Sequence, residues 1–167
     1  MRYILARLYG LRNREIETYR KLIEEMVREQ KALKAREIAL LNKCLENQQK
    51  LVEELYDLKK DSEEEQRALF EAAHVPKSER VFPYGRLTAY LGKEAQRLSS
   101  QERKIGNLIK KAKDINSENR HIVEVSHSFI CAYIDSLSEM RSRIFGYNES
   151  GKAQDTISQN IIVNQRN

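Results

Sequence analysis

The sequence predicts an all-α fold: an elongated antiparallel bundle of three to four long helices with coiled-coil-like packing and a mobile C-terminal tail. Gly and Pro are sparse, Trp is absent, and charged residues make up 33% of the 167 positions, a composition typical of long helices and coiled coils. Apolar residues also recur at three- and four-residue steps, which places them on one side of a helix. One domain is expected at this length, over residues 1–146, followed by a flexible tail at 147–167.

The first predicted element is a helical region over about residues 13–74, the hairpin half of the bundle. Asn13 is expected to cap its N-terminus. The apolar spacing slips at Lys34–Arg36, and the pattern leaves open whether this is one long helix or two joined by a tight turn. Residues 61–65 are acidic and predict an exposed extension that frays. The stripe of the second part runs through Ile38, Leu41, Leu45, Gln48, Val52 and Leu55.

The clearest boundary is a loop over about residues 75–86, because Pro76 and Pro83 lack a backbone donor and disfavour helix in the residues before them. A long helical region follows over about residues 87–146, with a short helix and a bend near Ser99–Ser100 before its main stripe. The stripe exceeds a globular helix of about 8–20 residues, so it needs a partner helix along its length. Its members include Leu98, Ile105, Leu108, Ala112, Ile115, Ile122, Phe129, Ile130, Tyr133, Leu137, Met140 and Ile144.

The charge distribution narrows the possible partners. The net charge is +5, and residues 80–120 hold ten basic and four acidic side chains. Such a segment is either a solvated helix face or a nucleic-acid surface, and the absence of interleaved aromatic residues favours the solvated face. No run approaches the ~18 apolar residues of a membrane span. The first residues make a poor signal peptide, so the chain is expected in the cytoplasm, without membrane insertion.

Sequence motifs of catalysis are missing. The chain has no Gly-rich phosphate loop, and His121 and His127 are six residues apart, which places them off each other's helix face without completing a metal ligand set. Cys44 and Cys131 lie on apolar stripes and are expected as small core residues rather than a disulfide. We therefore expect neither an enzyme nor a cofactor or metal.

Two asparagines interrupt the long stripe. Asn116 and Asn119 occupy positions where the periodicity predicts apolar side chains. A buried asparagine needs hydrogen-bond partners, and it can fix the register between packed helices. The alternative is that the pair marks a bend between a half packed internally and a half left for a partner.

Downstream of these asparagines the apolar face becomes broader than one neighbouring helix would hide. An exposed patch of this kind marks an interaction site, and a helix docked in a groove is the natural mode, with anchors at three- and four-residue steps. The candidate binding residues are Ile122, Val123, Phe129, Ile130, Tyr133, Ile134 and Leu137.

These features resemble the FlgN-type flagellar export chaperones over Ile16–Gly151. In the first half, Glu29-Gln30-Lys31-Ala32-Leu33 and a helix rich in Lys and Leu follow the family's opening pattern. In the second half, two asparagines three residues apart precede an aliphatic pair, Asn116-Ser117-Glu118-Asn119-Arg120-His121-Ile122-Val123. A closing tyrosine with a glycine four residues on, Tyr147-Asn148-Glu149-Ser150-Gly151, is similar as well.

The resemblance implies a small cytoplasmic chaperone that works without nucleotide. It implies cargo among the hook–filament junction (hook-associated) proteins, whose amphipathic terminal helices would be shielded, and delivery to the flagellar export gate or ATPase complex. Tyr147 and Gly151 would then contribute to docking on that gate. A monomer or weak homodimer is expected. The remaining alternatives are a self-associating structural coiled coil and a basic helical nucleic-acid-binding protein.

Overall fold

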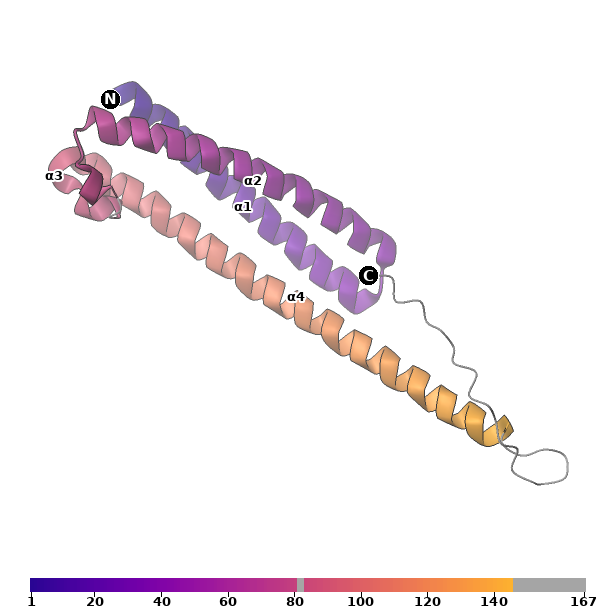
Figure 1. Ribbon diagram of the computed structural model, residues 1–167. Coiled ribbons are helices and arrows are strands. Elements are labelled where there is room, and N and C mark those ends of the chain that lie inside the picture. Colours follow the sequence, from indigo (N-terminus) through magenta and orange to yellow (C-terminus); the bar gives the residue numbers. More distant parts are fainter. Residues whose placement is uncertain (81–82, 146–167) are drawn as a thin grey trace, which may run out of the picture. The chain divides into compact units, whose positions relative to one another are not determined.

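The computed structural model describes residues 1–80 and 83–145, with side chains described to residue 140. Every regular element in these ranges is helical, which confirms the all-α prediction, and three of the helices are long. The elements, in chain order, are α1 (Arg2–Ala35), α2 (Ile38–Ala72), the 3-10 turns η1 (Lys77–Glu79) and η2 (Tyr84–Arg86), the short α3 (Thr88–Leu91), and α4 (Lys93–Phe145) (Figure 1).

The chain divides into two units at Val123–Glu124. The first contains α1, α2, α3 and the N-terminal part of α4, and the second contains the rest of α4. The predicted flexible tail at 147–167 lies outside the described residues, and the predicted division at residue 146 stays a prediction.

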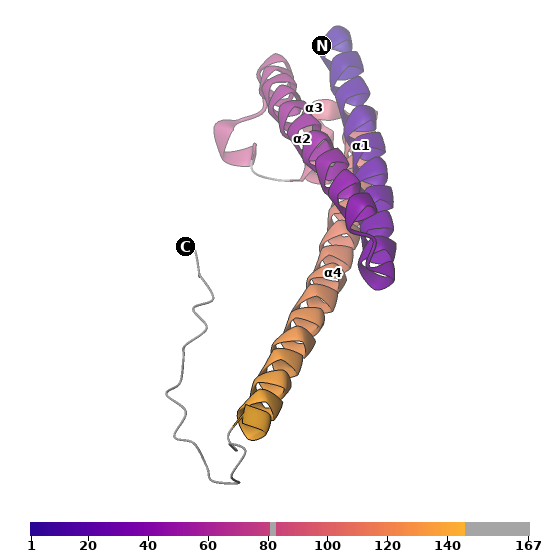
Figure 2. The ribbon, with the colours of Figure 1, turned by 90° about the vertical axis from the view of Figure 1, so that its right-hand side faces the viewer.

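Two separate helices make up the N-terminal hairpin. Arg36 adopts a left-handed conformation with φ 59° after the last residue of α1, and its N–H is bonded to the carbonyls of Ala32 and Leu33. A left-handed residue of this kind is a common helix terminator. The slip in apolar spacing at Lys34–Arg36 therefore corresponds to a tight turn, after which α2 returns beside α1 (Figures 1 and 2).

Helix α1 begins at Arg2, so the prediction of an N-terminal cap at Asn13 is wrong. Leu5 and Leu8 in the first turns are buried against α2 and the α3 region, and this burial stabilises the additional helix. Asn13 lies inside α1, where its side-chain oxygen accepts a hydrogen bond from Gln101 Nε2 at 2.8 Å.

The main core lies where α2 ends and α4 begins. The prediction that residues 61–65 fray is wrong, since α2 continues to Ala72. Asp61, Glu63 and Glu64 are exposed as predicted, whereas Ser62 is buried. Glu65 forms an ion pair of 3.0 Å with Arg7 of α1. The apolar residues that pack against this end of α2 lie elsewhere in the sequence. The acidic local sequence therefore gives no sign that this end of α2 is part of the core. The buried members of this core are Leu5, Leu8, Leu69, Phe70, Val75, Tyr84, Leu87, Leu91, Ala95 and Leu98.

The predicted stripe of α2 is only partly correct. Leu55 is buried, but Ile38, Leu45 and Val52 are exposed. The buried line passes through Cys44 and Leu58 instead. Apolar residues occupy two adjacent arcs of α2, and contact with the other helices of the first unit determines which arc is covered.

The bend before α4 lies at Gly92, with φ 55°, rather than at Ser99–Ser100. A positive φ is readily adopted by glycine because it has no Cβ. The predicted short helix is present as α3, before Gly92. After Gly92, α4 runs without interruption from Lys93 to Phe145 and carries the whole long stripe.

The contacts within the first unit establish the helix directions. Ion pairs join Arg7 to Glu65 and Arg14 to Glu54, so α1 and α2 are antiparallel. Along α4, Gln101 bonds to Asn13 and Asn119 bonds to Met26. Residue numbers therefore rise together, and this part of α4 runs parallel to α1 and antiparallel to α2.

Candidate functional site

All seven predicted binding residues lie on α4. Ile122 is partly exposed and Val123 is exposed at the end of the first unit. In the second unit Phe129 is 67% exposed and Ile134 is 54% exposed. The other predicted members, Ile130, Tyr133 and Leu137, are exposed as well.

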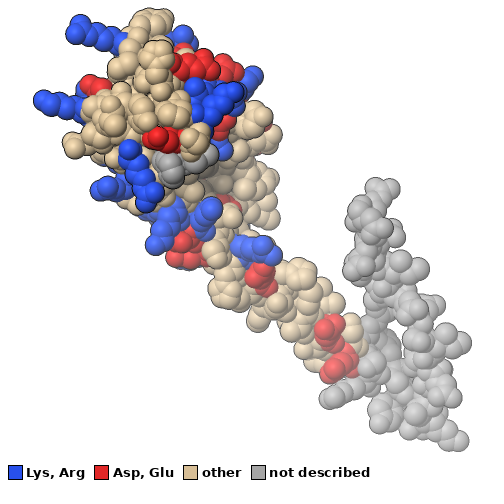
Figure 3. Space-filling view, turned by 60° about the vertical axis from the view of Figure 1, so that its left-hand side comes forward, with Lys and Arg blue, Asp and Glu red and all other residues tan. Residues whose placement is uncertain are grey.

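Helical geometry places these side chains on one face. With about 100° per residue, Phe129, Tyr133, Ile130, Leu137 and Ile134 fall within an arc of about 140°. Met140 is also exposed and extends the face by a turn. In the space-filling view the described helix of the second unit presents largely uncharged surface with a few acidic side chains (Figure 3). We call this surface, Phe129 to Met140, the α4 apolar face.

The α4 apolar face contains few groups that resist burial. Asp135 is the only Asp, Glu, Lys or Arg between Val125 and Ser138. Ser128 Oγ donates to Glu124 O at 3.0 Å and Ser136 Oγ donates to Ala132 O at 2.9 Å. These hydroxyl donors are satisfied by the helix itself, so covering them by a partner would not leave an unpaired donor. The arrangement suits the docking of an amphipathic helix.

Asn119 forms a buried polar contact between α4 and α1 in the first unit. It is 2% exposed, and its Nδ2 donates to Met26 O at 3.0 Å and to Glu29 Oε2 at 3.1 Å. Glu29 Oε2 also accepts from Gln48 of α2 at 2.8 Å. One carboxylate oxygen therefore joins three helices, an arrangement suited to fixing their register.

The two predicted register residues have different environments. Asn116 is exposed, so the structure does not bring it to the interface that Asn119 occupies. Asparagines three residues apart lie about 60° apart on a helix, which is enough to separate a buried position from an exposed one.

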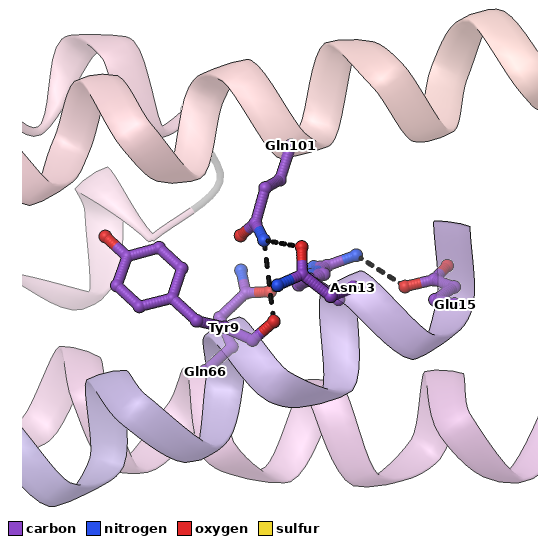
Figure 4. A network of polar contacts seen from close by, with 6 residues as sticks. Tyr9, Asn13, Glu15, Gln66 and Gln101 are labelled. Carbon is purple, nitrogen blue, oxygen red and sulfur yellow. Dashed lines mark hydrogen bonds and ion pairs between the residues drawn. The ribbon is translucent and has the colours of Figure 1, made fainter. Parts of the chain in front are cut away.

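A second polar network stabilises the other end of the first unit, and sequence reasoning missed it. Gln101 Nε2 points to Asn13 Oδ1, at 2.8 Å, and to Tyr9 O (Figure 4). Arg12 donates to Glu15 at 3.2 Å and to Gln66 of α2 at 3.4 Å. The sequence feature that could have revealed this network is Gln101, a polar residue at an inward-facing position of the long apolar stripe, like Asn119.

Burial changes the acid–base behaviour of two groups near this network. Burial, followed by a hydrogen bond to Glu94, raises the pKa of Tyr9 well above its usual range. Burial also raises the pKa of Glu15, although the neighbouring Arg12 acts in the opposite direction. Both groups belong to α1 in the first unit and are not part of the α4 apolar face.

The two cysteines differ. Cys44 is buried, as predicted, whereas Cys131 is exposed, so the prediction of Cys131 as a core residue is wrong. Cys131 lies on the part of α4 without a covering helix in the second unit. Burial raises the pKa of the Cys44 thiol, with a further contribution from Glu25.

The remaining predictions concern the proposed docking residues, metal binding and membrane insertion. Tyr147 and Gly151 lie outside the described residues. In the described ranges no three His, Cys, Asp or Glu residues are grouped so that they could hold a metal ion. No helix there combines the length and hydropathy needed to cross a bilayer.

The chain was compared with protein families, curated proteins and solved structures. The FlgN protein family matches residues 1–155, a span that includes the first residues of α1 as well as the region on which the resemblance was based. Neither the curated proteins nor the solved structures contain a significant match to this chain.

Proposed function

This chain belongs to the FlgN family of flagellar export chaperones, and from this premise we propose that its α4 apolar face binds the amphipathic terminal helices of hook-associated proteins. In this proposal the protein acts in the cytoplasm, keeps those helices from associating early, and delivers them to the export gate. Tyr147 and Gly151 are the proposed docking residues for the gate.

The exposed α4 apolar face is the observation that supports this proposal. Phe129, Tyr133 and Leu137 follow one another at four-residue steps, and all three are exposed. An amphipathic partner helix presents anchors at the same spacing. Exposed apolar patches of this extent on a soluble chain are typical of interaction sites.

Energetics allow a complex that forms and releases without nucleotide. An ordinary interface buries about 1,600 Å² in total, and burial of apolar area contributes about 25 cal/mol per Å². Much of this is offset by ordering the cargo segment and by lost translational and rotational freedom. The remaining affinity can protect the cargo and still permit transfer at the gate.

The variant Ile130→Asp tests the binding site. A carboxylate within the α4 apolar face would be buried without a partner in the complex, so we expect the affinity for the terminal helical segments of hook-associated proteins to fall by about 100-fold or more. Isothermal titration calorimetry with the full chain measures this. Val52→Asp on α2 is the matched control, because Val52 is 53% exposed and Ile130 is 55% exposed.

Two outcomes would overturn the assignment. Wild-type affinity in Ile130→Asp, or an equal loss in Val52→Asp, would show that the α4 apolar face is not the cargo site. Light scattering on the free chain tests the coiled-coil alternative: a stable oligomer that dissociates in Ile130→Asp would show that the face serves self-association.

A further inference from the structure

The first unit has a surface with positive charges that form no ion pair, distinct from the α4 apolar face of the second unit. Lys93, Arg103, Lys104, Lys110 and Lys111 of α4 are exposed, and no carboxylate in the described part of the chain forms an ion pair with any of them. We call these five residues the α4 basic face. Arg97 on the same helix is excluded from it, since Arg97 contacts Glu94 and the Tyr9 ring.

In the described part of the chain, the side chains that form ion pairs with carboxylates are arginines rather than lysines. Each of these pairs uses an arginine, at positions 7, 12, 14, 20, 28, 80 and 97. Four of the five cations on the α4 basic face are lysines. Arginine suits directional pairing with a carboxylate, whereas lysine is a hydrated point charge on a flexible stem. This composition favours a diffuse anionic surface over one specific carboxylate partner.

Three lysines of the α4 basic face form one row along the helix. With about 100° per residue, Lys93, Lys104 and Lys111 lie within an arc of about 20°, and they span about 27 Å along the axis. Arg103 and Lys110 form a second row about 90° around the helix. Lys93 is the first residue of α4, where the helix dipole disfavours a cation, so helix stability does not explain its charge.

We propose that the α4 basic face associates with the surface of an anionic lipid bilayer. Lysines in one row along a helix can all reach a plane of anionic headgroups at the same time. Each cation near such a surface contributes to the affinity. Nucleic acid is the competing polyanion, but single-stranded chains are usually bound with stacking aromatic residues, and the sequence from Lys93 to Lys113 contains none. This surface is separate from the α4 apolar face, and the proposal does not depend on cargo binding.

Vesicle flotation of the full chain tests the proposal. We expect binding to phosphatidylcholine vesicles that contain one-third phosphatidylglycerol, little binding to pure phosphatidylcholine, and loss of binding at about 0.5 M salt. The double variant Lys104→Gln/Lys111→Gln should lower partitioning by about tenfold or more. Lys43→Gln/Lys50→Gln on α2 has the same net charge and also replaces exposed lysines, so it should change partitioning less than twofold.

Three results would overturn the proposal. The first is absence of binding to the anionic vesicles at low salt. The second is a loss that does not follow the α4 basic face: an equal loss in both double variants would reduce the effect to net charge, and a loss in Ile130→Asp alone would assign the contact to the α4 apolar face. The third is tighter binding to a DNA duplex than to vesicles, abolished by Lys104→Gln/Lys111→Gln, which would assign the face to nucleic acid.

Discussion

The part of α4 in the first unit and the part in the second unit share one pattern but differ in burial. In the first unit, Leu98 is 1% exposed and Ile105 is 5% exposed. In the second unit, Phe129 and Ile134, which belong to the same apolar stripe, are more than half exposed. The comparison teaches that helical periodicity locates an apolar face but does not say what covers it.

Covering helices explain where the change occurs. Gln30 of α1 donates to Glu118 of α4 at 2.9 Å, and α1 ends at Ala35, five residues further on. Since α1 and this part of α4 run parallel, α1 has few residues left to cover α4 beyond Asn119. The first unit ends at Val123, close to the point where that cover ends.

The sharpest test of this comparison is a pair of truncations to alanine. Leu69→Ala removes a fully buried side chain from the core that includes Leu8 and Leu87, so we expect the free energy of unfolding to fall by about 2–5 kcal/mol. Ile134→Ala should cost less than about 0.5 kcal/mol, because the side chain is exposed. Urea unfolding followed by circular dichroism measures both. A comparable loss in Ile134→Ala would mean that the face is covered in the free protein.

A smaller difference is expected between the two asparagines. Asn119→Ala removes the hydrogen bonds to Met26 and Glu29 and should lower the free energy of unfolding by about 1 kcal/mol. Asn116→Ala should be neutral or slightly stabilising, because Asn116 is exposed and alanine is the better helix former. The same urea experiment separates them, and equal losses would contradict the register role of Asn119.

The smallest expected effect is a pH dependence in the first unit. Burial raises the pKa of Glu15, so the folded state holds this proton more tightly than the unfolded state does. The resulting stability is present below the ordinary Glu value of about 4.3 and is lost as pH rises through the raised value. Glu15→Gln should therefore gain stability relative to the native chain as pH rises above the ordinary Glu value. If the difference in free energy of unfolding between Glu15→Gln and the native chain does not change with pH, then burial of the Glu15 carboxylate does not destabilise the folded state.

Much of the candidate site could be predicted from the sequence. The apolar face between Ile122 and Leu137 follows from spacing alone, and the FlgN match supports its context. Asn116 and Cys131 could not be placed in the same way. Asn116 is one position from Ile115, and a rotation of about 100° separates the partly buried position from the exposed one. Cys131 lies among stripe residues that are themselves exposed, so its exposure depends on where the covering helices end.

The sequence by itself determined the helical fold and the existence of an apolar face along α4, because helix propensity and periodicity are local properties. It located the slip at Lys34–Arg36 but left open whether a turn lies there, and the left-handed Arg36 of the structure settles that there is one. Tertiary structure decided which parts of that face are buried. It extended α1 back to Arg2 and α2 on to Ala72, and it selected the Cys44 arc of α2 over the Val52 arc. The physical reason is that burial depends on where a second helix begins and ends, and that information lies in residues far away along the chain.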